Sequence, residues 1–417
     1  MRSHLTAFGV GAGFSLFVAA IVAIAAPKVS DAVSEKGGVH IVNIGRGGSG
    51  SFHLKEDGLN VSADWKGKFA FAADGRTLSS LKGEVEVVSV EKDAKRKAVF
   101  EGGGGDIQIS AYAGGEKIDA EDEAAELAGD LLQLFARSSG VNADQRVSAI
   151  MAESGKAGVI AEIGDLRSAH AVGAYIEAFA QSAKLDAGEI SALIDRIAML
   201  EGDYSKRTAI SAILKTQTLG EENEVRIIQA AKTIEGDHEL RLMIEDLAEH
   251  GVNARSLSIA SNLVEGIEGD HEIRLALSAF LENDAIDDVD AASLLDLAAT
   301  SIDGDYELRL AVEAAGDRVG GETVGAAAIR AIGSIEGAHD RRIAIDDMAD
   351  RLSADSSNWT ALIELAAAID GDYERRLAIE ALSSKAPDRP AYRAALKQAA
   401  ASISSEHERR LALESLD

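Results

Sequence analysis

From about residue 140 to the C-terminus, apolar residues recur at helical spacing in a pattern that repeats about every 34 residues. Each copy is marked by an aromatic or imidazole ring that is usually followed by an acid and an arginine, as in GDYELRLAV. The rings are His170, Tyr204, His238, His271, Tyr306, His339, Tyr373 and His407, at intervals of 34, 34, 33, 35, 33, 34 and 34 residues. Self-similarity at a fixed period of this length is typical of repeat proteins.

Each ring is predicted to lie in the first turn of a helix. A Gly or Ser two residues earlier suits the N-cap, and the acid after the ring reaches the third helical position, in an approximate capping box. Positions +2, +5, +6 and +9 from the ring form one apolar face. At Tyr306 these positions are Leu308, Ala311, Val312 and Ala315. The ring and position +4, here Leu310, form a second apolar face, which predicts neighbours on two sides of the helix.

The stretch before each ring predicts a partner helix, because positions −11, −8, −7 and −4 are also apolar. Before His238 these positions are Ile227, Ala230, Ala231 and Ile234. A single hairpin cannot cover both apolar faces, so burial, at about 25 cal/mol per Å² of apolar area, is gained only between neighbouring hairpins. We therefore predict a mainly α protein whose residues 141–417 form an α-solenoid of about eight helical hairpins.

The residues before the repeats have other patterns. Between 51 and 118, short alternating runs separated by Asp-Gly, Lys-Gly and Gly-Gly turns predict a small antiparallel β domain. The acidic start and helical period of residues 119–140 predict a connecting helix. Residues 28–50 are rich in Gly and Ser, which indicates a flexible linker.

Residues 1–27 are typical of a targeting segment, because Arg2 precedes an uncharged apolar stretch from Leu5 to Ala26. Ala23 and Ala25 form an A-x-A cleavage pattern, yet about 20 residues also suffice to span a bilayer. The segment is thus a signal peptide or an uncleaved membrane anchor. The rest of the chain is expected to be exported and periplasmic, either attached to the inner membrane or secreted.

Composition narrows the choice of partners. The formal charge of −28 would repel a phosphate backbone, which argues against nucleic-acid binding. The absence of cysteine excludes disulfides, thiolate nucleophiles and Cys-bound zinc. His-Glu pairs occur at three rings, but none is followed by the second histidine of an H-E-x-x-H zinc helix, and Tyr replaces His in other copies. No catalytic residue, metal site or cofactor is predicted, and each ring is expected to pack with its polar edge hydrogen-bonded.

A charged stripe accompanies the rings. An arginine recurs at position +3, commonly with an acid at +7 for an i, i+4 ion pair. Such a row either forms a structural, salt-bridged face or also binds an acidic partner. The arginines of this possible partner-binding stripe are Arg207, Arg241, Arg274, Arg309, Arg342, Arg376 and Arg410.

The repeat pattern I-x-S/G-D-Y/H-E-x-R-x-A-L, preceded by GKFAFAADGRTLSSL, resembles the extracytoplasmic region of bacterial membrane metallopeptidases of the penicillin-sensor type and of stand-alone envelope proteins that share it. The resemblance covers about residues 50–417 and implies a periplasmic sensing or interaction module. The chain has no H-E-x-x-H and one apolar segment, so the resemblance implies no catalysis.

The function predicted from these features is a non-enzymatic extracytoplasmic scaffold or sensor module. It would mediate interaction with other, unidentified proteins of the bacterial cell envelope, with the N-terminal segment at the membrane. The alternative is a binding module for a small ligand or cell-wall fragment at the junction of the β domain and the first repeats. Trp65 and Phe71 would supply the apolar wall of that site.

Overall fold

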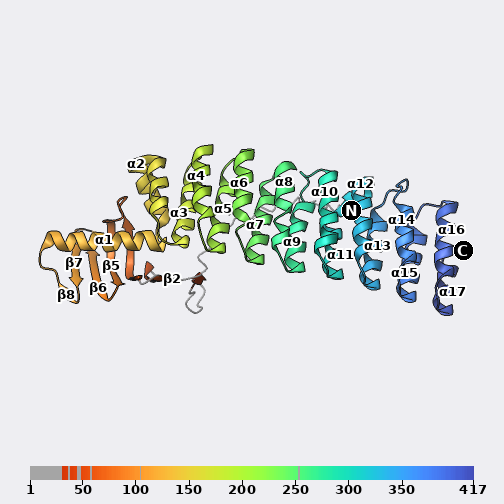
Figure 1. The fold of residues 1–417 in the computed structure, drawn as a ribbon, viewed down its shortest axis with the longest axis horizontal. Helices are drawn as coiled ribbons and strands as arrows, with labels where there is room; N and C mark the ends of the chain where they lie inside the picture. The colour runs from red at the N-terminus through yellow and green to blue at the C-terminus, as the bar shows by residue number, and fades with distance from the viewer. Residues whose placement is uncertain (1–30, 36–37, 45–47, 57–58, 104, 252–253) are drawn as a thin grey trace, which may run out of the picture.

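The computed structural model describes residues 31–417 except 36–37, 45–47, 57–58, 104 and 252–253. The protein is mainly helical and has a small antiparallel sheet at its N-terminal end (Figure 1). The predicted signal or anchor segment, residues 1–27, lies outside the described residues. Within those residues, no helix combines the length and apolar character needed to span a membrane.

The sheet is an antiparallel meander in which each strand pairs with its neighbours in sequence, in the order β1-β2-β3-β4-β5-β6-β7-β8. The described strands are β1 (Asp31–Glu35), β2 (Gly38–Ile44), β3 (Gly50–Glu56), β4 (Leu59–Phe71), β5 (Leu78–Glu91), β6 (Ala94–Gly103), β7 (Gln108–Ala113) and β8 (Glu116–Lys117). The prediction of a flexible linker over residues 28–50 is therefore wrong for β1 and β2, which pair with each other and with β3. The segment GVHIVNI contains four β-branched residues, which favour a strand, although the glycines around it indicated a linker.

Helix α1 (Glu121–Ser139) follows the sheet and packs against strands β3 to β7. Its Phe135 is the centre of an aromatic core, with ring centroids between 5.5 and 6.1 Å from those of four sheet residues. These residues are Phe52, Trp65, Phe69 and Phe71. The predicted connecting helix therefore also covers the sheet. Trp65 and Phe71 are only 5% and 1% exposed, so they cannot form the wall of an open ligand site.

Sixteen further helices lie within the described residues, in eight consecutive pairs. They are α2 (Ala143–Asp165), α3 (Ala169–Ser182), α4 (Ala187–Ala198), α5 (Asp203–Thr216), α6 (Glu221–Ala231), α7 (Asp237–His250), α8 (Ala254–Ser261), α9 (Asp270–Leu281), α10 (Asp288–Ser301), α11 (Asp305–Ala314), α12 (Glu322–Ser334), α13 (Ala338–Arg351), α14 (Trp359–Ala367), α15 (Asp372–Lys385), α16 (Pro390–Ala401) and α17 (Glu406–Glu414). Short 3₁₀ turns, Val264–Gly266 and Gly316–Gly320, occur in two of the connections.

The paired helices form two rows (Figure 1). Odd-numbered helices from α3 to α17 each pack on the next odd-numbered helix, and even-numbered helices from α2 to α16 pack on the next even-numbered one. One apolar core continues through both rows from Ala143 to Leu416. Each hairpin thus covers its neighbour, and the described array is helical-repeat-like in architecture.

The predicted helix starts are confirmed. The residue two before the ring is the N-cap of each odd-numbered helix: Ser168, Gly202, Gly236, Gly269, Gly304, Gly337, Gly371 and Ser405. The face at +2, +5 and +6 is also confirmed, since Leu308, Ala311 and Val312 are at most 4% exposed. The prediction that the ring packs inside is wrong, because Tyr306 is 56% exposed. The ring lies over Arg309 of its own helix, whose Nε bonds Asp340 of the next odd-numbered helix at 2.9 Å.

Candidate functional site

The arginines at position +3 link successive repeats. The Nε of each arginine bonds the acid at position +1 of the next copy, at distances up to 2.9 Å. The pairs are Arg207 with Glu239, Arg241 with Glu272, Arg274 with Glu307, Arg309 with Asp340, Arg342 with Glu374, and Arg376 with Glu408. The last arginine, Arg410, pairs with Glu414 of its own helix and is 57% exposed.

These links occupy the arginines that the sequence offered as a partner-binding stripe. The six that have a following repeat are only 12 to 20% exposed. The predicted i, i+4 pairs form in several copies, as between Arg309 and Glu313. The acid at +1, expected to take part in a capping box, instead bonds the preceding repeat. The sequence signal for this contact is that an acid at +1 and an arginine at +3 occur in the same copies. The two residues that bond each other are 31 to 33 residues apart, so the contact cannot be recognised within one helix.

One carboxylate shows the electrostatic effect of this ladder. Burial alone would raise the pKa of Glu307, but hydrogen bonds from Arg274 and His271 and their charges hold that pKa below its ordinary value. The carboxylate is therefore ionised and neutralised within the array.

A second ladder is formed by the aspartate immediately before the ring. Its carboxylate accepts hydrogen bonds from two backbone amides of the following copy, in the turn that precedes the next odd-numbered helix. The aspartates are Asp203, Asp237, Asp270, Asp305 and Asp372. The amides of Ser405 and Ser404 hold the pKa of the Asp372 carboxyl below its ordinary value. The copy at His339 has Ala338 at this position and lacks the link.

At two of the N-caps, this aspartate approaches the glycine too closely for a Cβ. A Cβ on Gly337 would lie 2.6 Å from Asp305 Oδ2, and one on Gly304 would lie 2.9 Å from Asp270 Oδ2. Gly337 has a φ of −67°, so it is not required by backbone conformation. At Gly304 and Gly337 the missing side chain leaves space for the carboxylate of the preceding repeat, whereas Ser405 forms the same link with a Cβ present.

The rings themselves form an exposed row along the array. We call Tyr204, His238, His271, Tyr306, His339, Tyr373 and His407 the ring row, because all of them are exposed whereas His170 is half-buried. The three tyrosines are 47 to 56% exposed, and each lies over the guanidinium at +3, with 5.1 to 5.4 Å between Cζ and the ring centroid. Histidines take a similar place, since Nδ1 of His238 lies 3.2 Å from Arg241 Nη2. The structure thus brings the predicted ring residues together on one solvent-facing edge.

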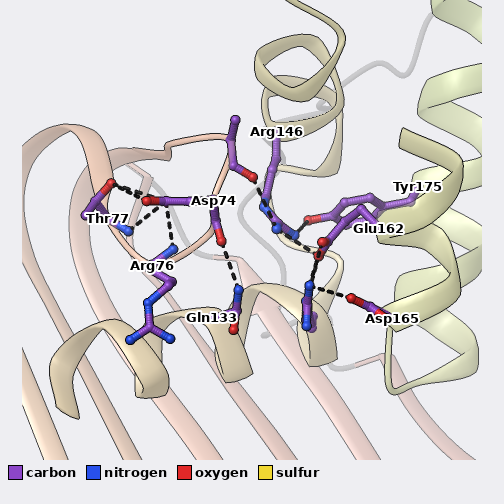
Figure 2. Close-up of polar contacts among 10 residues, drawn as sticks. Asp74, Arg76, Thr77, Gln133, Arg146, Glu162, Asp165 and Tyr175 are labelled. Atoms are coloured by element: carbon purple, nitrogen blue, oxygen red, sulfur yellow. Dashed lines mark hydrogen bonds and ion pairs between the residues drawn. The ribbon is translucent and has the colours of Figure 1, made fainter. Parts of the chain in front are cut away.

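A buried polar cluster joins the sheet to the array (Figure 2). Arg146 of α2 is fully buried and forms an ion pair of 2.8 Å with Glu162 of the same helix. Its Nη1 donates to the Tyr175 hydroxyl of α3 at 2.9 Å, and its Nη2 lies 3.5 Å from the Ala73 carbonyl in the β4–β5 turn. Glu162 also accepts two hydrogen bonds of 2.8 Å from Arg137 of α1. Three helices and one turn therefore meet at this cluster.

The β4–β5 turn is shaped to cover Arg146. Asp74 Oδ1 accepts from the amides of Arg76 and Thr77, and Gln133 of α1 donates to the Asp74 carbonyl at 3.0 Å (Figure 2). Gly75 has a φ of +67°, and a Cβ there would lie 2.7 Å from Arg146 Nη2. Sequence reasoning missed this cluster, because nothing in the local sequence around Arg146 indicates that the arginine is buried. Its arrangement positions the sheet against the array and leaves no open space for a substrate.

A cleft lies beside this cluster, where α1, the sheet and the α2–α3 connection meet. It has a volume of about 570 Å³ and is lined by Leu54, Leu59, Glu91, Arg96, Asp130, Leu131, Gln133, Leu134, Arg137 and Arg167. Arg96, Asp130 and Arg137 are each in ion pairs. Arg167 is exposed, and its guanidinium makes no ion pair or hydrogen bond with the described part of the chain. The cleft therefore combines leucine side chains with one available cation.

The described residues contain no group of three or more His, Cys, Asp or Glu placed to hold a metal ion. Comparison with other proteins adds no assignment, since no family profile, characterised protein or solved structure matches this chain.

Proposed function

We propose that the helical array is an α-solenoid and that it works as a non-enzymatic scaffold for protein–protein interaction. The observation that supports this proposal is the ring row, an exposed series of flat rings held at one edge of a regularly stacked array. Tyrosine side chains supply large contact area at little cost in conformational entropy. Repeat arrays commonly bind their partners along such extended surfaces.

The two ladders suit a scaffold because they hold neighbouring hairpins in one register. Between Tyr204 and Tyr306, each interface between copies has an apolar core, an aspartate bonded to two amides and an arginine bonded to the next helix. A repeat can slide or tilt only by breaking all three together. The array would therefore present its edge at nearly constant spacing to a partner.

The scaffold is proposed to act in the cell envelope, as a periplasmic or membrane-attached sensor or interaction module. This location is supported by Arg2 and the apolar run from Leu5 to Ala26. Fusion of residues 1–50 to an enzyme that is active only after export tests it. Activity of the fusion, abolished by charged residues within the apolar run, is expected. An inactive fusion that accumulates inside the cell would contradict it.

Site-specific photo-crosslinking tests the scaffold function. A photoreactive residue in place of Tyr306 should yield a discrete adduct in living cells, because it replaces one exposed ring with another. The matched control replaces Val289, which is 66% exposed and lies in the other row of helices. Adducts at Tyr306 and none at Val289 would support the proposal. Absence of adducts from every ring-row position, or equal labelling at Val289, would contradict it.

The cleft favours a second candidate function, the binding of a small ligand that has an acidic group and an apolar part, such as a cell-wall fragment. Arg167 would bind the acid, and Leu59 and Leu134, which are half-buried, would contact the apolar part. Titration with dodecanoate, and with dodecyltrimethylammonium as the cationic control, tests this candidate. Saturable binding of dodecanoate alone that is lost in Arg167→Ala is expected. Equal binding of both amphiphiles would count against the site.

A further inference from the structure

A row of exposed carboxylates lies alongside the ring row. Three residues before each ring, six successive copies carry an exposed acid: Glu201, Glu235, Glu268, Asp303, Glu336 and Asp370. Each of these six acids lies in the turn that leads to its ring-bearing helix. In four of those turns the amides of the acid and the following glycine bond the aspartate of the preceding copy. The carboxylate row and the ring row therefore share one edge of the array.

The charge that remains on this edge is negative. Each arginine at +3 is matched by the acid at +1 of the next copy, so this pair contributes little net charge. The copies at Tyr204, His339, Tyr373 and His407 carry a further cation at +2, and the charges of Arg375 and Arg409 act on Asp372. The copies at His271 and Tyr306 have no cation at +2, and each has the aspartate before the ring and the acid three residues before it. Together they leave up to two negative charges per copy, in line with the formal charge of −28. An acidic partner would be repelled here, and a basic partner would be attracted.

The apolar part of the edge suits the stems of long cationic side chains. Below each ring, position +4 is a half-buried aliphatic residue in most copies, such as Leu275, Leu310 and Leu377. Lys and Arg pack their methylene stems on apolar surface while the charged head stays in water. A cation over a tyrosine face gains about 0.5 to 1 kcal/mol at an exposed site. In the five copies from His238 to Tyr373, the ring, the aliphatic residue at +4 and the carboxylate thus form one set of contacts for a Lys or Arg side chain.

Spacing selects the conformation of the partner. Packed helices lie about 8 to 10 Å apart, so neighbouring rings recur at about that distance. A polyproline II segment rises about 3.1 Å per residue with three residues per turn, so the same face recurs about every 9 Å. An extended segment with one cationic side chain at every third residue would therefore meet successive copies in register.

We infer that the ring row and its carboxylates form a docking surface for an extended basic segment of another protein, with Lys or Arg at every third position. This inference rests on the proposed scaffold function and names the chemistry of the partner. It differs from the reading in which the arginine row binds an acidic partner, because the structure directs those arginines into the contacts between repeats.

Binding of defined peptides to the purified full chain tests the inference. The probe is a labelled 15-residue peptide of five Lys-Pro-Ser repeats, followed by fluorescence anisotropy. One control has the same composition with the lysines at irregular spacing, and another has Glu in place of Lys. We expect the regular peptide to bind at least fivefold more tightly than the irregular one and the acidic peptide not to bind. Equal affinity of the two basic peptides would overturn the inference.

Variants of the chain separate this surface from general attraction to an acidic protein. Replacing Tyr306 and Tyr373 together by Ser should weaken the regular peptide about tenfold, by loss of two ring contacts. Replacing Met199 and Val289 by Ser removes equally exposed apolar residues, each 66% exposed, from the even-numbered row and its turns and should leave affinity unchanged. Equal effects of the two double variants would contradict the docking surface.

A third variant tests the charges while keeping the rings. Glu268→Gln, Asp303→Asn and Glu336→Gln together should weaken binding and reduce its dependence on salt. If these peptides fail while Tyr306 still forms a crosslink in cells, the scaffold function stands and the partner chemistry is wrong. If both experiments fail, the proposed function falls as well.

Discussion

The aspartate ladder makes a prediction in two directions, because the copy at His339 lacks the aspartate. Asp305 accepts hydrogen bonds from the amides of Glu336 and Gly337, at 2.8 and 2.7 Å. In the next copy Ala338 stands at the same position. A Cβ on Gly371 would lie 3.6 Å from the Ala338 Cβ, and a Cβ on Gly337 would lie at the similar distance of 3.8 Å from the Asp305 Cβ. An aspartate at 338 therefore has the space and geometry to form the missing link.

The magnitude follows from the bonds concerned. Hydrogen bonds to a charged group contribute about 1.5 to 3 kcal/mol each when well buried. Asp305 is half-exposed, so solvent screening reduces the sum of two bonds to about 1 to 2 kcal/mol. A further gain of about 0.3 to 1 kcal/mol applies to an acid at a helix N-terminus. We expect Asp305→Ala to lose about 1.5 kcal/mol locally and Ala338→Asp to gain about 1 kcal/mol.

Amide hydrogen exchange measures these effects where they arise. Global unfolding of a repeat array is not reliably two-state, whereas exchange reports on local opening. In Asp305→Ala the Gly337 amide should exchange about tenfold faster, and the Gly371 amide should be unchanged. In Ala338→Asp the Gly371 amide should be slowed about fivefold to tenfold, with Gly337 unchanged. Unchanged Gly371 exchange in Ala338→Asp would refute the reasoning, because the geometry for the link is present.

Three further predictions concern the ion pairs. Arg309→Ala should cost about 1 to 3 kcal/mol of local stability, because two carboxylates lose their cation, whereas Arg410→Ala at the last copy should cost less than about 0.5 kcal/mol. Amide exchange around each substituted position compares the two variants, and similar losses would contradict a ladder. Arg146→Met should cost about 2 to 4 kcal/mol, read as a lower urea midpoint of Trp65 fluorescence in chains that also carry Trp359→Phe. An unchanged midpoint would contradict a stabilising role of the cluster at the junction. The pKa of the Asp372 carboxyl lies below its ordinary value of 3.8, so its hydrogen bonds stabilise the array fully above pH 3.8 and are lost only as the pH falls through the lower folded pKa. Protection of the Ser404 and Ser405 amides from exchange should therefore be unchanged at pH 5 and should fall well below pH 3.8. Loss of protection already at pH 5 would contradict this assignment.

The sequence by itself determined the features that depend on residues close together in the chain. The period of about 34 residues, the Gly or Ser at each N-cap and the buried face at Leu308, Ala311 and Val312 follow from helical spacing and capping. The alternating runs of residues 51–118 likewise predicted the strands from β3 onward. Local backbone preference and hydrophobic period carry this information directly.

Tertiary structure decided which residues meet across repeats and across the junction. The acid at +1 was assigned to its own helix, yet Glu307 bonds Arg274 of the preceding copy, about one repeat away in sequence. Tyr306 was expected to pack inside, but it is exposed and lies over Arg309 of its own helix, which bonds Asp340 of the next copy. Arg146 is buried only because the β4–β5 turn closes over it at Gly75. Such contacts depend on the stacking geometry of whole hairpins, which no pattern within a single repeat specifies.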